Sequence, residues 1–459
     1  MDLLLNTVQS YDWGSVTALP RLLGTEPSGA PQAELWMGAH PAAPSRVRRD
    51  HRTLPLDQVI AADPLAELGA ATLRRFGPRL PFLLKLLAAD APLSVQVHPD
   101  LAQARAGFAR ENALGIPTDA PHRTYRDAHH KPEMIVALSR FRGLCGFRAP
   151  RECADLLDAL AVPALRPYAE SLRALPEEKT LAEAGPLRET GAPSEAEPPT
   201  RTGALPDTGA LPEPRALAGT GALPETGALA EVFTAFLRPP AGLVTSVAEA
   251  VEAAAVLAGP HREDFAAYAT VARAHPGDPG LLAALMLRRV ELAPGEGLFL
   301  AAGVPHAYLS GLGVEIMASS DNVLRCGLTS KHVDVAELLK VVRFTAAPTR
   351  VLTPRGEEGE EVYAAPVDDF RLSRFRLRAD GPARRLAPGP PQILLCVDGE
   401  AAVTSTAGAV RIGPGRSVYV PAAAEVALTG TGTVFRGTVG TPEVRRRQLD
   451  ADTKPRAPH

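Results

Sequence analysis

The chain has 459 residues, which is too long for one ordinary hydrophobic core and predicts two or three domains. Its 49 basic and 52 acidic residues give a net charge of −3 with no basic stripe, so nothing points to nucleic-acid binding. The four cysteines are scattered and form no CxxC pair, so neither a disulfide framework nor a thiolate zinc site is indicated.

The first 148 residues are predicted to form short strands and turns with helical pieces between them. The N-terminal sequence MDLLLNTVQSYDWG lacks the basic region of a signal peptide, and no apolar run approaches the ~20 residues that cross a bilayer. We therefore expect a cytoplasmic protein that binds no membrane. Helices are predicted over 64–77 and over 100–115, the second with Asp100 as N-cap and Gly115 past its end. The candidate strands PFLLKLLAA and KPEMIVAL flank that second helix.

The stretch APLSVQVHPD, residues 91–100, alternates strictly between apolar and polar side chains. This pattern predicts a β-strand on which Ser94, Gln96 and His98 share one face. The polar face is either an ordinary solvated surface or the inner wall of a site, and the alternation alone does not distinguish the two.

Residues 149–280 have helical spacing of Leu and Ala and predict a helical subdomain, with helices at 246–259 and 263–275. Within it, from about 176 to 230, the unit Thr-Gly-Ala-Leu-Pro recurs irregularly. Pro, Gly, Thr and Glu without aromatic residues bury too little surface to offset the entropy of ordering. We interpret this stretch as a disordered insertion in a loop.

The sequence LAPGEGLFLAAGVPHAY, near residue 300, predicts a turn, an apolar strand, a second turn and then a histidine. Small barrels of the cupin type hold metals with this kind of arrangement. Residues 1–148 and 281–345 are therefore expected to form a cupin-type jelly-roll barrel. Residues 346–443 repeat the rhythm, and GPGRSVYVPA echoes the earlier stretch without its histidine. They predict a second, metal-free jelly-roll-like barrel, followed by a flexible tail over 444–459, in a chain that is mainly β with α.

A metal site is the chemistry that these strands favour. Gln96 and His98 leave the same strand face, and a barrel interior can bring Glu133 and His306 against them. Two imidazoles, a carboxylate and an amide oxygen suit Zn²⁺ and tolerate Mn²⁺, Fe²⁺ or Co²⁺. A rival cluster consists of His129 and His130 beside Glu133, and spacing alone does not decide between them.

The polar stretch SSDNVLRCGLTSKHVD, residues 319–334, is predicted from composition alone to be a solvated loop. Cys326 is expected to be an inert thiol because no partner histidine lies nearby. Nothing in the chain matches a phosphate-binding glycine loop or a GxSxG nucleophile elbow.

Several long segments, in order over about 1–345, resemble the type I mannose-6-phosphate isomerases. They are YDWGS (11–15), ELWMGAHPAAPS (34–45), PFLLKLL (81–87), LSVQVHPD (93–100), HKPEM (130–134), FRGLCGF (141–147), HAYLSG (306–311) and VEIMASSDNVLRCGLTSKHVDV (314–335). Beyond residue 345 the resemblance is architectural only, and the insertion at 176–230 has no counterpart in the family that we can place.

The resemblance implies roles for particular residues. One zinc ion per chain would be held by Gln96, His98, Glu133 and His306, and Arg325 would be the essential catalytic arginine. Four further positions match the family near the metal or the sugar phosphate and are expected to bind substrate: Ser94, Lys131, Glu315 and Lys331.

The implied reaction interconverts D-mannose 6-phosphate and D-fructose 6-phosphate through a cis-enediol, a step of carbohydrate metabolism that can supply GDP-mannose biosynthesis. The motif does not settle the general base, for which Glu315 and a metal-bound hydroxide are candidates. The expected partner is a small sugar phosphate, and the expected state is a monomer. Two rival functions are a different sugar reaction such as epimerisation, and a sugar-sensing role on a decayed enzyme scaffold. The second is disfavoured because no ligand and no arginine has been lost.

Overall fold

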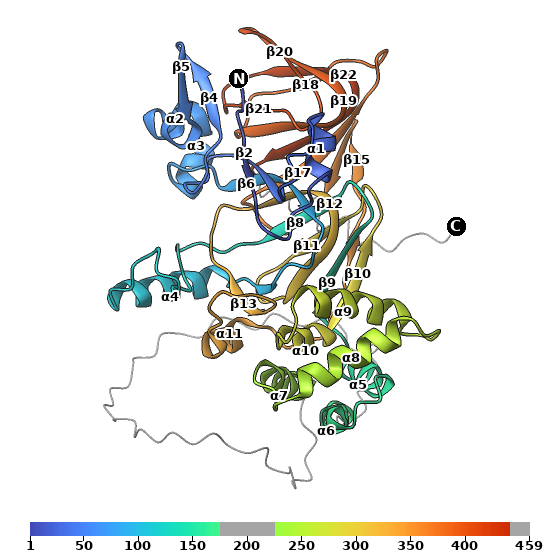
Figure 1. The fold of residues 1–459 in the computed structure, drawn as a ribbon. Coiled ribbons are helices and arrows are strands. Elements are labelled where there is room, and N and C mark those ends of the chain that lie inside the picture. The colour runs from blue at the N-terminus through green and yellow to red at the C-terminus, as the bar shows by residue number, and fades with distance from the viewer. Residues whose placement is uncertain (175–224, 358, 441–459) are drawn as a thin grey trace, which may run out of the picture.

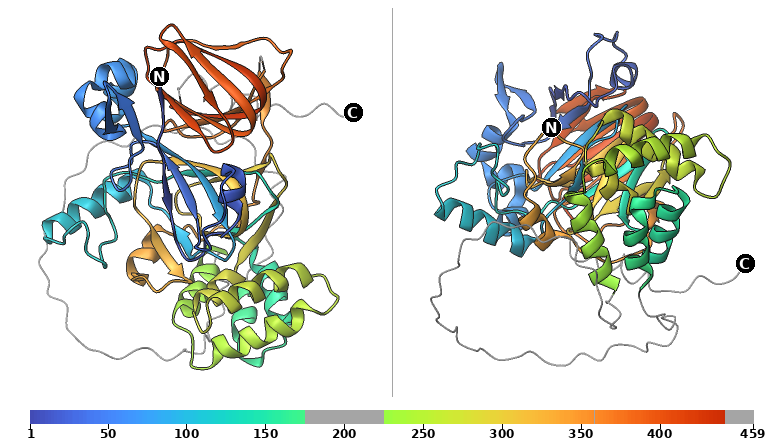
Figure 2. Two further views of the ribbon diagram at one scale, coloured as in Figure 1. Left: turned by 45° about the horizontal axis from the view of Figure 1, so that its top comes forward. Right: turned by 60° about the horizontal axis from the view of Figure 1, so that its bottom comes forward.

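A computed structural model describes residues 1–174, 225–357 and 359–440. In Figure 1 the C-terminal strands lie at one end, a second group of strands lies in the middle, and the helices from the middle of the chain cover the other end. The two further views in Figure 2 keep this order of layers. The prediction of a mainly β protein with helices is confirmed.

The middle layer is an 11-stranded sheet, which we call the central sheet. Its main path runs β14-β11-β8-β12-β6-β3-β2, and β7, β9, β10 and β13 pair at its side. Its strands are β2 (Thr7–Gln9), β3 (Glu34–Met37), β6 (Phe82–Ala89), β7 (Val95–Val97), β8 (Glu133–Ala137), β9 (Phe141–Phe147), β10 (Leu287–Leu292), β11 (Gly297–Leu300), β12 (His306–Ala318), β13 (Leu324–Gly327) and β14 (Val351–Leu352).

The second layer is a nine-stranded sheet, which we call the C-terminal sheet. Its strands are β1 (Asp2–Leu3), β15 (Arg355–Glu357), β16 (Glu360–Tyr363), β17 (Arg371–Leu377), β18 (Arg384–Leu386), β19 (Gln392–Ser405), β20 (Gly408–Ile412), β21 (Ser417–Val420) and β22 (Val426–Thr438). Because β1 pairs with β21, the first residues of the chain belong to this sheet rather than to the expected first domain. This long-range pairing left no mark on the local sequence pattern.

Alternate residues of the long central strands face two different surroundings. Leu84 and Leu86 of β6 and Ile316 of β12 join Ile393 and Phe435 of the C-terminal sheet in one buried apolar core. The residues between them, among which are the charged ones, face the other way. The two sheets therefore pack together through one face of the central sheet, and the opposite face is left for a polar interior.

The helices of the third layer pack on one another and on the strands β7 and β13. They are α5 (Pro150–Ala159), the 3-10 turn η1 (Pro163–Leu165), α6 (Arg166–Arg173), α7 (Glu225–Leu237), α8 (Leu243–Ala255), α9 (Arg262–Ala274) and α10 (Gly280–Leu285). Their core includes Val95 and Val97, which are the apolar side of the APLSVQVHPD strand. That strand is shorter than predicted, since His98 follows its last paired residue.

The predicted insertion at 176–230 falls mostly on 175–224, outside the described residues. Its predicted end at 230 differs from the structure, because α7 begins at Glu225 and buries Ala228 and Leu229 completely. Leu229 belongs to the helical core together with Val232 and Phe233 of the same helix, so packing anchors this end of the repeat. The predicted tail at 444–459 also lies outside the described residues.

The remaining elements lie around the sheets: α1 (Ala18–Leu23), β4 (Arg46–Arg49), β5 (Arg52–Pro55), α2 (Leu56–Ala62), α3 (Pro64–Phe76), α4 (Leu101–Ala113) and α11 (Val335–Val341). The helices predicted at 64–77 and 100–115 are confirmed as α3 and α4. Asp100 caps α4 through a capping box with Gln103, and Gly115 adopts φ +69° just past its end.

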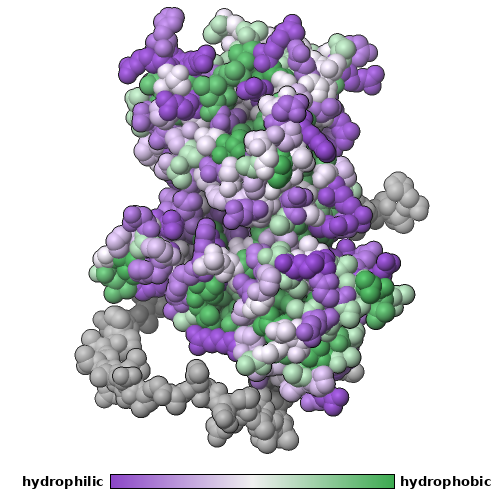
Figure 3. All heavy atoms as spheres, in the orientation of Figure 1, coloured by the Kyte–Doolittle hydropathy of each residue, from purple (hydrophilic) through white to green (hydrophobic). Residues whose placement is uncertain are grey.

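The described surface is mixed in character. On the face shown in Figure 3, hydrophilic and hydrophobic side chains are interspersed. Among the described residues, no helix is long and apolar enough to span a lipid bilayer.

Candidate metal centre

Three segments of the central sheet bring His98, Glu133 and His306 together. His98 follows β7, Glu133 begins β8 and His306 begins β12. Their exposed fractions are 1%, 5% and 4%, and each offers a ligand atom within 4.8 Å of the other two. Both histidine Nε2 atoms lie 3.4 Å from Glu133 Oε2. Within the described ranges, this is the cluster of His, Cys, Asp or Glu side chains that could hold a metal.

Backbone carbonyls orient both imidazoles toward the cluster. His98 Nδ1 lies 2.9 Å from the carbonyl oxygen of Asn322, and His306 Nδ1 lies 3.0 Å from that of Val304. A ring that donates from Nδ1 presents the lone pair of Nε2, which is the arrangement found around protein-bound metals. His98 Nε2 is buried and has no hydrogen-bond partner in the described structure.

The protonation states also suit a cation. Burial lowers the pKa of His98 to about 4, although Glu133 opposes the effect, so this imidazole is neutral near pH 7. Burial alone would raise the pKa of Glu133, but Lys131 and the two histidines outweigh it and hold that pKa well below its usual value. Two imidazoles and a carboxylate form a donor set that fits Zn²⁺.

The structure places Gln96 beside this cluster. It is paired with His306 of β12 on one side and with Arg325 of β13 on the other. Its Nε2 donates to the hydroxyl of Ser94 at 3.1 Å, which leaves the amide oxygen available to a cation. The polar face of APLSVQVHPD is therefore turned toward the cluster, as an inner wall rather than an ordinary surface.

The rival cluster of His129, His130 and Glu133 does not form. His130 Nε2 lies 2.9 Å from Asp369, and His129 Nδ1 lies 3.2 Å from Arg79 Nη2. Both histidines therefore have partners away from Glu133, which begins β8 three residues after His130.

The segment 319–334 is a solvated loop only in part, since residues 330–332 are exposed but its first half is mostly buried or half-buried. It contains β13, and Ser320 and Asn322 are 1% and 0% exposed. The Asn322 side chain accepts from the backbone N–H of Arg126 at 2.7 Å and donates to the carbonyls of Asp127 and His129, both at 2.8 Å. The side chains of Ser320 and Asn322 are satisfied inside the protein by the 126–129 loop, and the same Asn322 supplies the carbonyl that orients His98.

A second set of buried charged side chains lies on the same face of the central sheet as Glu133. Lys85 Nζ lies 3.0 Å from Glu315 Oε2 and 3.3 Å from Glu34 Oε1, and all three are at most 6% exposed. Tyr308 donates to Glu315 at 3.0 Å, and Trp36 Nε1 donates to Glu34 at 2.7 Å. Burial raises the pKa of Glu315, with Lys85 opposing it.

Sequence reasoning did not select Lys85, Glu34 or Tyr308. The available signal was the single charge in the otherwise apolar strand PFLLKLLAA, because a lysine is rarely buried without a partner. Of the residues expected to bind substrate, Lys131 lies at the cluster, with its Nζ 3.1 Å from Glu133 Oε1.

Arg325 and Lys331 lie with Arg126, which the sequence reasoning also missed, in a group of cations. Burial lowers the pKa of Arg325, and Arg126 lowers it further. Burial likewise lowers the pKa of Lys331, with added repulsion from Arg325 and Arg126. No acidic side chain among the described residues pairs with any of the three. Uncompensated cations of this kind attract an anion such as a phosphate.

Comparison with known proteins gives a consistent result over nearly the whole chain. The family description "Phosphomannose isomerase type I, catalytic domain" matches residues 1–150. A protein of Escherichia coli named mannose-6-phosphate isomerase is 37% identical over 443 residues, which cover 95% of this chain and 99% of that protein. A mouse protein of the same name is 30% identical, over 81% of this chain and 80% of its own.

Solved structures agree. The Salmonella typhimurium mannose 6-phosphate isomerase bound to fructose 6-phosphate and zinc matches with a TM-score of 0.78 and 33% identity, over 96% of this chain and 100% of that one. A mannose 6-phosphate isomerase bound with zinc and yttrium matches with the same score and coverage.

Proposed function

The chain belongs to the mannose-6-phosphate isomerase family, and on that premise we propose that it interconverts D-mannose 6-phosphate and D-fructose 6-phosphate with zinc as cofactor. The observation that carries this proposal is the buried cluster of His98, Glu133 and His306 beside the uncompensated cations at Arg325. A decayed scaffold that only senses sugar has no reason to keep both.

We infer that one zinc ion is held by Gln96, His98, Glu133 and His306. When bound, zinc supplies Lewis acidity toward the oxygens of the open-chain sugar. The chain contributes the carbonyls that fix both imidazoles, and it contributes Lys131, whose ammonium neutralises part of the charge of Glu133.

We infer that the sugar phosphate is positioned by Arg126, Arg325 and Lys331, with the Ser94 hydroxyl nearby. Ser94 accepts from Gln96, so its own proton is free to be donated to the substrate. Arg325, which keeps its proton at any ordinary pH, also opposes the negative charge that develops on the enediol.

Glu315 is our candidate for the base that moves the proton between C2 and C1. It lies on the interior wall, it is a carboxylate outside the proposed ligand set, and Tyr308 and Lys85 fix its orientation. A carboxylate with a raised pKa is better matched to abstracting a proton from carbon than an ordinary one.

We also propose that each sheet closes into a jelly-roll barrel of the cupin type, with 149–280 as a helical subdomain. The support is the crossover order of the central sheet, in which β8, β6 and β9 all pair with β12, and the separate inner core of the C-terminal sheet.

A coupled assay tests the function. Purified protein is given mannose 6-phosphate, and fructose 6-phosphate is measured before chelation, after chelation and after zinc is added back. We expect turnover before chelation, loss of turnover after chelation, and recovery when zinc is added back. Formation of glucose 6-phosphate instead would favour epimerisation, and binding of the sugar without turnover would favour a sensor. Either result would overturn the proposal.

A further inference from the structure

A cavity of about 450 Å³ lies on the flank of the central sheet and borders the turn that leads to His306. It is bounded by β11, the turn at 301–305, the segment 343–352 that leads into β14, and residues 364–366 after β16. None of the residues assigned above to the metal or the sugar phosphate lines it. Its volume falls within the range typical of small-molecule sites, about 300–1,000 Å³.

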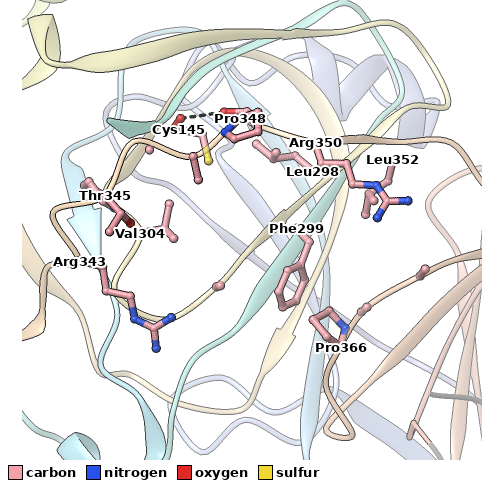
Figure 4. A pocket seen from close by; sticks show the side chains of 17 residues that line it. Cys145, Leu298, Phe299, Val304, Arg343, Thr345, Pro348, Arg350, Leu352 and Pro366 are labelled. Atoms are coloured by element: carbon pink, nitrogen blue, oxygen red, sulfur yellow. Dashed lines mark hydrogen bonds between the residues drawn. The ribbon is translucent and has the colours of Figure 1, made fainter. Parts of the chain in front are cut away.

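The walls of this cavity are largely apolar. Leu298 and Phe299 come from β11, and Val304, Leu352 and Pro366 complete the sides shown in Figure 4. Cys145 also lines it, and burial raises the pKa of its thiol to about 12, so that it is an uncharged part of the wall at neutral pH. Such walls favour the hydrocarbon part of a ligand.

Two arginines line the cavity. Arg343 and Arg350 lie on opposite sides of the view in Figure 4, with Phe299 between them. Arg343 is exposed, and no carboxylate among the described residues pairs with it. Its backbone N–H donates to the carbonyl of Gly303 at 2.9 Å, and its side-chain stem lies against Gly303. The guanidinium therefore extends from an anchored stem, which lowers the entropy lost on pairing with an anion.

We propose that this cavity binds a small amphipathic carboxylate, with its charge on Arg343 and its hydrocarbon part against Phe299, Val304 and Leu352. A compact hydrophilic anion such as inorganic phosphate would pair with the arginine but make no apolar contact. A neutral hydrocarbon would contact the apolar wall but leave the arginine without an anion. The combination of an apolar cavity and a cation without a carboxylate partner selects the amphipathic class.

The test uses the zinc-loaded full chain and isothermal titration calorimetry with octanoate as the probe. Octanamide, which has nearly the same shape and no charge, is the matched ligand control. Arg343→Gln removes the cation, and Ala365→Phe fills the cavity from its lining. Arg105→Gln, an exposed arginine on α4, is the matched protein control.

We expect octanoate to bind at one site, and octanamide and the Arg343→Gln variant each to weaken binding by about tenfold or more. Ala365→Phe should abolish binding, and Arg105→Gln should leave it unchanged. Zinc content shows that each variant is folded. If Ala365→Phe fails that check, the Arg343→Gln and octanamide results decide.

The proposal fails if octanoate does not bind at millimolar concentration, or if octanamide binds equally well. It also fails if Arg105→Gln weakens octanoate as much as Arg343→Gln does, because binding would then follow total charge rather than this cavity.

Discussion

The two sheets have the same antiparallel construction but fill their inner faces with different side chains. The inner strand residues of the C-terminal sheet form a core of hydrocarbon and one thiol, with Leu394, Cys396 and Val434 among them. The corresponding face of the central sheet carries Lys85, Glu133 and Glu315, all buried. Burying charges costs free energy that pairing only partly returns, so a fold assembled for stability alone would use the first solution. The second solution provides the chemistry.

The comparison extends to single turns. β11 and β21 each follow a Pro-Gly turn and each end at a further turn, but the first turn leads to His306 and the second leads to Pro421 and Ala422. Strand geometry positions the residue after the turn, and only the central sheet places a metal ligand there. The predictions below test whether zinc binding and catalysis belong to the central sheet alone.

The largest effect is expected from His306→Ala. Loss of one imidazole leaves Gln96, His98 and Glu133 as an incomplete ligand set, so zinc occupancy should collapse and turnover should fall on the order of 10³-fold or more. Metal analysis by mass spectrometry and the coupled assay measure both. The matched control is His122→Ala, an exposed histidine, which should keep its zinc. Full zinc occupancy in His306→Ala would remove His306 from the ligand set.

Arg325→Ala should keep its zinc and lose turnover by roughly 10²–10³-fold, because a cation that opposes developing negative charge is removed from the site. Steady-state kinetics on zinc-loaded protein measure the change, and Arg105→Ala is the control. A kcat within about threefold of the unmodified chain, below ~0.7 kcal/mol, would show that Arg325 is not catalytic.

Asn322→Asp should produce a smaller change that still reaches the metal. The substitution sets a carboxylate oxygen against the carbonyls of Asp127 and His129, where an amide now donates two hydrogen bonds. The carbonyl that orients His98 then shifts, and zinc affinity should fall by about 10–100-fold. Competition with a fluorescent chelator measures it. Asn112→Asp, on α4, is the comparison, and equal affinities in the two variants would limit Asn322 to a structural role.

These residues also show which parts of the site can be predicted from the sequence. Alternation placed Ser94, Gln96 and His98 on one face, and the turn before His306 was visible, because both are local patterns. Asn322 was predicted to lie in a solvated loop, because its hydrogen-bond partners lie near residue 127, almost two hundred residues earlier. Lys85 and Arg126 were missed for the same reason. Strand pairing brings Lys85 to Glu315, and the contact of the 126–129 loop with Asn322 brings Arg126 toward Arg325, so neither role has a local signal. The pairing of β1 with β21 likewise has no local signal.

The smallest effect on activity is expected from Leu394→Ala, which probes the other sheet. Leu394 is fully buried in the apolar inner core, so its truncation should cost about 2–5 kcal/mol of unfolding free energy through lost burial and the cavity left behind. Chemical denaturation measures that loss. Because no charge and no metal ligand lies in that core, zinc affinity and kcat per folded molecule should stay within about twofold. A zinc affinity that weakened together with stability would mean that the C-terminal sheet holds the ligands in place through the core it shares with β6 and β12, and the division between a stabilising sheet and a chemical one would have to be given up.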